Sequence, residues 1–317
     1  MRITVLAGGI GGARFLSGLK LAEPNADITV IGNTADDIWL FGLKICPDLD
    51  TLMYTLGGGI DSDKGWGRND ETWRVKEELA AYRADPTWFG LGDLDFATHI
   101  YRTSLLTNGL TLTEVTKKLC ERWQPGVELL PMTDARVETH VVVDLPGEGV
   151  KAIHFQEWWV KHQAKYPAKS ITQVGAESAA PAPGVVEAIN DADVVLLPPS
   201  NPVVSIGAIL SISGIAQAIK NTNAPVVGLS PIIGDAPVRG MADACLQAIG
   251  VKTSAAAVAR HYGPRTNGGL IDAWLMDEVD EDSASGLRSD GFKVDVGPLW
   301  MSTPDATADM AKRALAI

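Results

Sequence analysis

The chain has 317 residues, of which 46% are hydrophobic and 21% charged, and this composition fits one large α/β domain spanning residues 1–317. Its formal net charge of -12 argues against nucleic acid and anionic membranes as partners, because both present negative phosphates. Three widely separated cysteines form no CxxC pair, which disfavours a structural zinc site or a disulfide framework. With no signal peptide and no apolar run of about 20 residues, we expect a cytoplasmic protein.

The first elements alternate between strand and helix. Residues 3–7 are an apolar run that ends in the glycine-rich stretch GGIGG, and an amphipathic helical pattern follows to about Leu21. Residues 27–31 show the next strand pattern, which leads into GNTADD. A strand, a helix and a strand joined by short links predict the start of a parallel sheet.

The middle of the chain is less regular and more polar. A loop rich in glycine and aspartate occupies residues 57–70, and helical patterns follow near residues 71–83 and 95–106. Another helix is expected from Thr111, where Thr-Leu-Thr-Glu has the spacing of a capping box. We therefore expect residues 45–135 to form a largely helical insertion.

An antiparallel unit is predicted after this insertion. Residues 138–144 and 151–160 have the pattern of two strands joined by the turn LPGEGV, which would place Trp158 and Trp159 in the second strand. Residues 166–184 are rich in alanine and proline, which indicates an exposed connection.

The strand-helix alternation then returns. Residues 194–197 and 226–229 are apolar runs followed by helix-starting residues, and a C-terminal helix is expected from Thr303 or Asp305. The predicted class is α/β, with a doubly wound, Rossmann-like parallel sheet built from both ends of the chain. In such sheets ligands bind beyond the carboxyl ends of the strands.

The GGIGG loop follows the first predicted strand. It is not a dinucleotide fingerprint, because Arg14 occupies the position of the last glycine, and no Gly-Lys-Ser/Thr follows as in a Walker loop. Glycines can still let backbone N–H groups approach an anion at a helix N-terminus. Gly9, Gly11 and Gly12 are therefore predicted to bind a nucleotide, and the alternative is an ordinary tight turn.

A second loop, LPPSNPVVSIG at residues 197–207, follows a later strand. Its prolines fix φ and make the loop stiff, while Ser200, Asn201 and Ser205 offer side-chain hydrogen bonds. A helix beginning near Ser205 would add free N–H groups and the positive end of its dipole. These features predict a rigid, neutral cradle for a phosphate or a nucleotide, although Ser205 could also serve only as a helix N-cap.

Acidic residues recur with short spacing, beginning with Asp36 and Asp37. In an extended chain, residues i and i+2 point the same way, so an Asp-x-Asp pair can hold a hard cation such as Mg²⁺. A negatively charged protein that binds an anionic diphosphate needs such a cation, whereas a lone pair of this kind also occurs in solvated turns. The three pairs are Asp48 with Asp50, Asp61 with Asp63, and Asp93 with Asp95.

Several stretches in this order resemble one family. They include GGIGGARFLSGL, PDLDT, GWGRNDETW, LGDLDFATH, FQEWWV and PSNPVVSIG. Over nearly its whole length the chain resembles the 2-phospho-L-lactate transferase family of coenzyme F420 biosynthesis, whose actinobacterial members act as phosphoenolpyruvate transferases. The resemblance also implies a homodimer.

The resemblance implies a reaction between two small molecules. The acceptor is 7,8-didemethyl-8-hydroxy-5-deazariboflavin, and the donor is a guanosine diphosphate diester that carries phosphoenolpyruvate or phospholactate. A ribityl hydroxyl of the deazaflavin attacks the donor phosphorus that bears the three-carbon acid, GMP leaves, and Mg²⁺ assists. No residue rule decides between the two acids, and the resemblance to actinobacterial members favours phosphoenolpyruvate.

Site residues can be assigned from the resemblance together with the motifs. Asp48 and Asp50 are the predicted catalytic residues and Mg²⁺ ligands, and one of them could also orient or deprotonate the attacking hydroxyl. Archaeal members often carry a basic residue where this chain has Leu94, so that contact with the deazaflavin is not expected here. The residues predicted for the deazaflavin pocket are Asp50, Trp66, Gly67, Asp93 and Thr133.

Two other classes of function remain open at this point. A metal-dependent transferase could use an Asp-x-Asp pair to hold a nucleotide sugar, and a nucleotide sensor would bind its ligand without turnover. The five histidines lack zinc-binding spacing and no GxSxG occurs, which disfavours zinc or serine chemistry. Product formation from the deazaflavin and a guanylyl donor, compared with a panel of nucleotide sugars, separates these classes.

Overall fold

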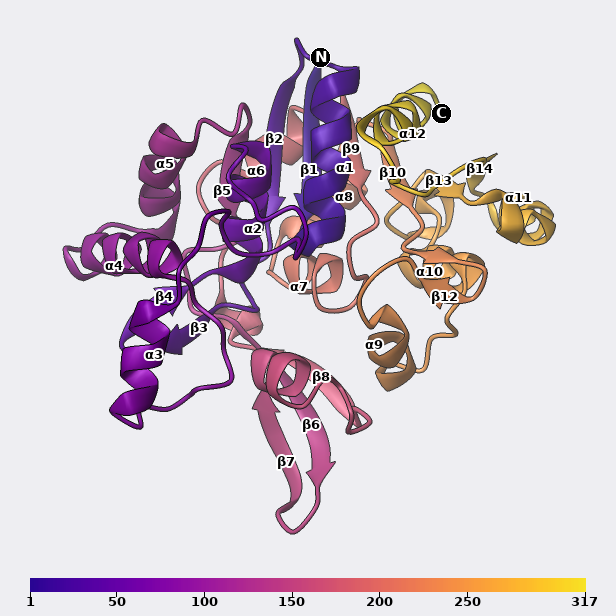
Figure 1. The fold of residues 1–317 in the computed structure, drawn as a ribbon. Helices are drawn as coiled ribbons and strands as arrows, with labels where there is room; N and C mark the ends of the chain where they lie inside the picture. Colours follow the sequence, from indigo (N-terminus) through magenta and orange to yellow (C-terminus); the bar gives the residue numbers. More distant parts are fainter.

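A seven-stranded sheet forms the centre of the computed structural model, which describes residues 1–317. The strand order is β14-β13-β10-β9-β1-β2-β5, and every neighbouring pair is parallel (Figure 1). The predicted α/β class with a parallel core is therefore confirmed. The strands are β1 (Arg2–Ala7), β2 (Asp27–Gly32), β5 (Glu128–Pro131), β9 (Val194–Leu197), β10 (Val226–Leu229), β13 (Ala273–Met276) and β14 (Lys293–Val296).

The strand order of the sheet changes direction between β1 and β9. From β1 the sheet extends through β2 to β5 on one side, and from β9 it extends through β10 and β13 to β14 on the other. Because Ile3 pairs with Val194 and Val5 pairs with Leu196, β1 and β9 end side by side. Their connections then diverge, and such a switch point is where doubly wound sheets bind ligands.

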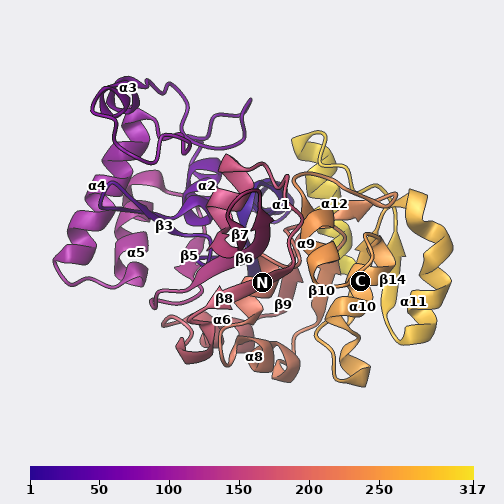
Figure 2. The same ribbon diagram turned by 90° about the horizontal axis from the view of Figure 1, so that it is seen from below.

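Helices cover both faces of this sheet (Figures 1 and 2). Because both faces are buried, strands such as β9 consist entirely of buried aliphatic residues. One face packs against α1 (Gly9–Ala22), α2 (Pro47–Leu56), α5 (Leu112–Trp123) and α12 (Pro304–Ala316). The other packs against α6 (Val185–Asn190), α7 (Ile206–Leu210), α8 (Ile215–Asn221), α9 (Ala242–Ala248), α10 (Ala255–Tyr262) and α11 (Ala284–Asp290).

Residues 45–135 contain four of the helices and end in β5 at the sheet edge. Thr111 forms the expected capping box at the start of α5. Its hydroxyl accepts a hydrogen bond from the Glu114 N–H at 3.2 Å, and its own N–H donates to the Glu114 carboxylate at 2.8 Å. The other helices of this region are α3 (Arg74–Ala81) and α4 (Asp93–Thr107), and the hairpin of β3 (Ile38–Leu40) and β4 (Leu43–Ile45) immediately precedes α2.

A three-stranded antiparallel sheet projects below the main sheet in Figure 1. It consists of β6 (Glu138–Leu145), β7 (Gly149–His154) and β8 (Ser170–Val174), and the hairpin predicted across LPGEGV is present. The expectation that residues 166–184 are only a connection is wrong, because β8 pairs with β6 within them.

The expectation for the two adjacent tryptophans is also wrong. Trp158 and Trp159 lie in a π-helical turn, Glu157–Lys161, rather than in β7. A buried Trp158 followed by a half-buried Trp159 fits a strand or a helical turn equally well, because so short a run has no readable period. Lys161 donates to Glu157 at 2.7 Å, an ion pair at helical spacing that favours the turn.

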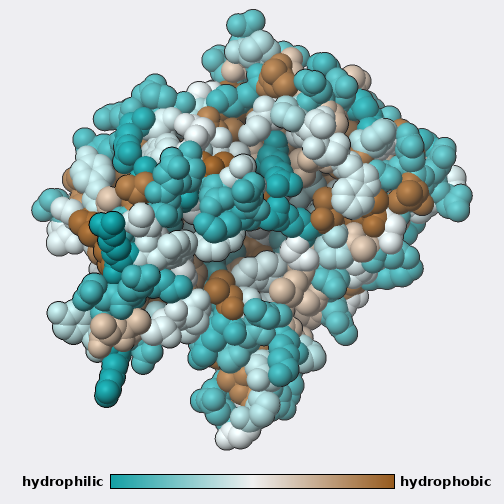
Figure 3. All heavy atoms as spheres, viewed as in Figure 1, coloured by the Kyte–Doolittle hydropathy of each residue, from teal (hydrophilic) through white to brown (hydrophobic).

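The molecular surface is mostly hydrophilic on the face shown in Figure 3, where hydrophobic residues occur singly or in small groups. Among the helices, none combines the length and the apolar composition that crossing a membrane requires.

Trp66 and Trp300 are exposed aromatic side chains, and both line the cavity that lies beyond the strand ends.

Candidate functional site

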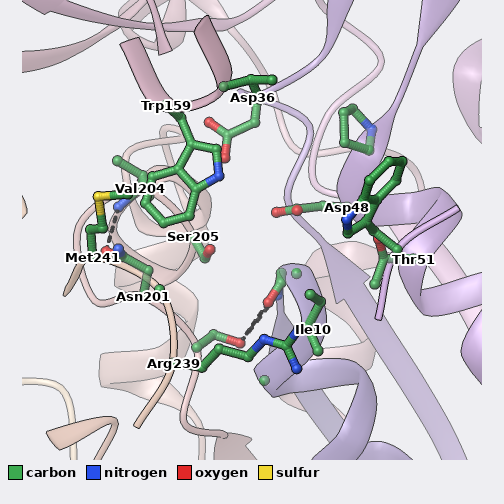
Figure 4. Close-up of a pocket in the computed structure, with 18 of the residues that line it drawn as sticks. Ile10, Asp36, Asp48, Thr51, Trp159, Asn201, Val204, Ser205, Arg239 and Met241 are labelled. Atoms are coloured by element: carbon green, nitrogen blue, oxygen red, sulfur yellow. Dashed lines mark hydrogen bonds between the residues drawn. The ribbon is translucent and has the colours of Figure 1, made fainter. Parts of the chain in front are cut away.

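A cavity of about 1100 Å³ opens beyond the carboxyl ends of β1 and β9. The loops that follow these two strands line it, together with the first turn of α2, part of α4 and residues 238–242. Figure 4 shows labelled residues from these segments around one open space. A cavity of this size can hold a nucleotide together with a second planar molecule.

The loop after β1 packs directly on the loop after β9. Helix α1 begins at Gly9, immediately after the strand, and Gly8 precedes it in extended conformation. The Ser200 hydroxyl donates to the Gly8 carbonyl at 2.9 Å and accepts from the Gly8 N–H at 3.3 Å. The two loops predicted to form a nucleotide cradle are therefore brought together.

The glycines of GGIGG serve this contact in different ways. A Cβ at Gly11 would lie 2.5 Å from the Pro199 carbonyl oxygen, and a Cβ at Gly12 would lie 2.7 Å from the Ser200 hydroxyl. Gly9 and Gly11 line the cavity, whereas Gly12 is buried against β1 and does not. Gly12 is thus a packing residue, because the loop after β9 and the end of β1 fill the space that a side chain at this position would need.

Replacement of Gly11 by alanine is expected to lower the free energy of unfolding by about 1–3 kcal/mol, because the added methyl group overlaps the Pro199 carbonyl. Urea denaturation measures this loss. Gly286→Ala in α11 is the matched control, since its Cβ would meet only an arginine side chain. An alanine variant of Gly11 with unchanged stability would contradict the packing seen here.

Asn201 organises the loop after β9. Its Oδ1 accepts hydrogen bonds from the N–H groups of Val203 at 2.9 Å and Val204 at 3.2 Å. Ser205 occupies the N-cap position of α7, as the alternative interpretation expected, but its side chain makes no capping hydrogen bond. Ser200, Asn201 and Ser205 all line the cavity, in the place where the sequence predicted a polar cradle.

Two carboxylates face the cavity from different elements. Asp36 follows β2, and Asp48 lies in the first turn of α2, where the Asn33 amide donates to it at 2.9 Å. Figure 4 shows both carboxylates directed into the open space. Neither forms an ion pair, although the neighbouring Asp37 is paired with Lys44 at 2.8 Å.

The electrostatics of Asp36 and Asp48 fit a bound cation. Burial raises the pKa of Asp36 well above its usual range, and the nearby charge of Asp48 raises it further. Burial also raises the pKa of Asp48 to about 6. The Asp36 Oδ1 atom is buried without a hydrogen-bond partner. No group of three or more His, Cys, Asp or Glu side chains is placed to hold a metal ion, so the protein itself supplies at most two such ligands here.

Asp50 does not join this pair, which corrects the expected Asp48–Asp50 geometry. Both residues lie in the first turn of α2, where side chains at i and i+2 point in different directions. Both Asp50 oxygens accept hydrogen bonds from Arg102, with Oδ2 3.1 Å from Nη1. The carboxylate that faces Asp48 across the cavity is therefore Asp36.

The predicted deazaflavin contacts are only partly brought together. Asp50 and Trp66 line the cavity, whereas Gly67, Asp93 and Thr133 do not. Asp93 is directed toward the start of α3, where its carboxylate accepts a backbone N–H at 3.0 Å. The Thr133 side chain is fully buried and donates to a backbone carbonyl at 2.6 Å. Both side chains thus hold the structure around the site together.

Asp95 and His99 line the cavity, although the sequence analysis assigned neither of them to the deazaflavin pocket. They lie on α4 and are 6% and 2% exposed. Burial, followed by the charges of Asp50 and Glu71, raises the pKa of Asp95 to about 7. The signal was present in LGDLDFATH, because Asp95 and His99 are four residues apart and share one helix face. The interpretation as an extended Asp-x-Asp pair named Asp95 only as a cation ligand together with Asp93, and it gave His99 no role.

Cationic side chains line the same cavity. Arg14 and Arg239 form no ion pair with an acidic residue, and Arg239 donates to the Lys64 carbonyl at 3.0 Å. Burial, followed by the nearby charge of Arg14, lowers the pKa of Arg239. In a chain with a net charge of -12, two unpaired guanidinium groups beside a cavity favour an anionic ligand.

A parallel sheet with a polar cavity at its switch point is typical of α/β proteins that bind nucleotides. Residues 3–295 match the model of a family described as 2-phospho-L-lactate transferase CofD, and the chain belongs to this family. It is therefore a transferase by family.

Relatives of high identity carry a more specific name. A phosphoenolpyruvate transferase of Streptomyces coelicolor is 64% identical over 317 residues, which cover 100% of this chain and 98% of the relative. One of Thermobifida fusca is 60% identical over 323 residues, covering 99% and 97%. A solved structure of a UPF0052 family protein from Bacillus halodurans has a TM-score of 0.62 at 16% identity, covering 99% of each chain, and shares the fold.

Proposed function

We propose that this chain transfers a phosphoenolpyruvyl group from a guanosine diphosphate diester to a ribityl hydroxyl of 7,8-didemethyl-8-hydroxy-5-deazariboflavin, with release of GMP, in coenzyme F420 biosynthesis. The names of its relatives support phosphoenolpyruvate as the three-carbon acid, and phospholactate is the alternative. The observation that carries the proposal is the pair of buried, unpaired carboxylates, Asp36 and Asp48, facing the cavity.

The donor fits the wall formed by the loops after β1 and β9. Backbone groups of Gly9 and Gly11 and the polar side chains of the second loop line this wall. Glycine-rich strand-to-helix turns bring backbone N–H groups close to phosphates, and the unpaired Arg14 and Arg239 add positive charge. The loop residues proposed to hold the guanylate part are Ser200, Asn201 and Ser205.

The deazaflavin fits the part of the cavity bounded by α2 and α4. Trp66 and Phe89 present aromatic surface there, and Asp95 and His99 add polar groups. Planar ring systems pack well against aromatic side chains. The ribityl chain then leads toward Asp48, between the two substrate regions.

The chain's own residues position the reacting groups and accept a proton. The hydroxyl oxygen forms a bond to the phosphorus that bears the three-carbon acid, and the bond from that phosphorus to the bridging oxygen breaks, so that GMP leaves with this oxygen. The hydroxyl proton passes to the Asp95 carboxylate, whose pKa of about 7 suits a general base. Asp36 and Asp48 would hold Mg²⁺, which supplies neutralisation of the donor phosphates.

The pH profile tests the proton acceptor. Since only ionised Asp95 can accept a proton, kcat/KM of the wild-type enzyme is expected to rise as the pH increases through about 7. Asp95→Asn is expected to lose this rise and about 10²–10⁴-fold in rate. A variant with the wild-type rate and profile would remove Asp95 from the mechanism.

The raised pKa of Asp95 also predicts how the stability of the protein depends on pH, which can be measured independently of its activity. Between pH 3.8 and about 7 the folded protein holds a proton on Asp95 that the unfolded chain releases, so this group's stabilising contribution is lost as the pH rises through that range. At pH 8 the asparagine variant is therefore expected to be no less stable than wild type, as thermal unfolding can measure.

Product analysis tests the function as a whole. The protein with Mg²⁺, the deazaflavin and the guanylyl phosphoenolpyruvate donor is expected to yield GMP and a phosphodiester product, identified by mass. The phospholactate donor gives a product heavier by two hydrogens, so one measurement separates the two acids. Turnover of a nucleotide sugar without turnover of the deazaflavin would replace this proposal with the other transferase class.

A further inference from the structure

A buried polar chain connects α2 to the cavity through α4. Arg102 is 1% exposed and donates to both oxygens of Asp50. The same guanidinium also lies 3.0 Å from Nδ1 of His99, one helical turn earlier, and His99 lines the cavity. Asp50, Arg102 and His99 therefore form one hydrogen-bonded group, in which Asp50 and His99 line the cavity and Arg102 lies behind them.

This group fixes which nitrogen of His99 carries the proton. An arginine guanidinium stays protonated in proteins and can only donate hydrogen bonds. The Nδ1 atom that faces Arg102 must therefore be the acceptor, and the single ring proton must lie on Nε2. Burial, above all, lowers the pKa of His99 to about 4, so the ring is neutral at physiological pH. His99 is thus a hydrogen-bond donor of fixed orientation.

The donor that results has no partner within the protein. Nε2 of His99 is buried and makes no hydrogen bond, although buried polar groups are nearly always paired. The surrounding cavity wall contains the aromatic side chains Trp66 and Phe89 and the carboxyl group of Asp95. An unpaired N–H in a wall of this kind is suited to an acceptor atom on a planar, uncharged ligand.

We propose that His99 determines specificity for the hydroxyl-bearing substrate, by donating an Nε2–H hydrogen bond to a carbonyl oxygen or ring nitrogen of its heterocycle. Asp50 and Arg102 act as positioning residues, because they hold the imidazole in the required tautomer. This inference rests on the proposed function. Under the proposed function the donor phosphates bind beside Asp36, Asp48 and the glycine-rich loop, on elements other than α4.

Isosteric replacement tests the inference in the full-length protein. The side-chain amide N–H₂ of glutamine reaches about as far as Nε2, whereas asparagine reaches only as far as Nδ1. His99→Gln is therefore expected to retain deazaflavin binding within a few-fold, and His99→Asn and His99→Phe to weaken it roughly ten-fold or more. Titration of the deazaflavin without guanylyl donor, followed by its fluorescence, measures the dissociation constant directly.

Three further readouts make the result specific. GDP affinity is expected to stay within two-fold of wild type in every His99 variant, since GDP occupies the other wall, and the loss in activity should appear in KM for the deazaflavin more than in kcat. His261→Phe on the exposed side of α10 is the matched control and should leave deazaflavin binding unchanged. Comparison of glutamine with asparagine remains decisive if the phenylalanine variant fails to fold.

The possible results separate the role of His99 from the proposed reaction. Rescue by glutamine and loss with asparagine support the assignment. Equal deazaflavin affinity in wild type, His99→Asn and His99→Gln overturns it while leaving the proposed reaction intact. A wild-type protein that binds GDP but not the deazaflavin overturns both, because the acceptor substrate itself would then be wrong.

Discussion

Replacement of Asp48 by asparagine is expected to lower turnover by roughly 10³-fold or more, because metal-assisted charge stabilisation contributes several kcal/mol to such a transition state. Asp48 and Asp36 are buried carboxylates that face the cavity and form no ion pair. Neutralising one of them would remove half of the carboxylates that we propose to hold Mg²⁺. Steady-state rates with a saturating guanylyl donor, measured over a series of Mg²⁺ concentrations, give the size of the loss.

Thermal unfolding provides an independent readout of the same site. Mg²⁺ together with GDP is expected to raise the melting temperature of the wild-type protein and to have little effect on Asp48→Asn, because a ligand stabilises only the state it binds. Asp63→Asn, in the exposed loop, changes a carboxylate of another Asp-x-Asp pair and should behave like wild type. Full activity in Asp48→Asn, or a loss in Asp63→Asn, would move the metal site elsewhere.

The core of the fold could be predicted because its central strands are buried on both faces. Strands β1, β2, β9 and β10 appear in the sequence as short, nearly continuous aliphatic runs followed by turn residues. The outer strands β13 and β14 were not identified. β14, with the sequence KVDV, lies at the edge of the sheet and is too short and too polar for a pattern, so only its pairing with β13 defines it.

The candidate metal site could be predicted only in part from the local sequence. Pro47 at the start of α2, followed by acids in the first turn, is a helix-start signal that argues against an extended Asp48-x-Asp50 pair. That signal was readable in the sequence. The opposition of Asp36 and Asp48 was not, because it depends on how α2 packs against the end of β2. The loops after β1 and β9, both predicted to bind a nucleotide, could be expected to meet, since both follow parallel strands.

The second large effect is expected from Arg102→Met, which should lower the free energy of unfolding by about 3–5 kcal/mol. Asp50 is 5% exposed, and Arg102 is its charged partner. Removing the guanidinium leaves a buried carboxylate without a counter-charge and also removes the donor to His99. Such a loss is a large part of a typical total stability of about 5–15 kcal/mol, so urea denaturation should show it clearly.

A double variant distinguishes a catalytic Asp50 from a positioning one. Asp50→Leu combined with Arg102→Met replaces the ion pair by apolar side chains and should recover most of the lost stability, because no buried charge remains unpaired. If Asp50 only positions Arg102 and His99, the refolded double variant should bind the deazaflavin more weakly yet keep measurable turnover, since Asp48 and Asp95 are intact. Restored stability with no detectable turnover would instead show that the Asp50 carboxylate takes part in the reaction.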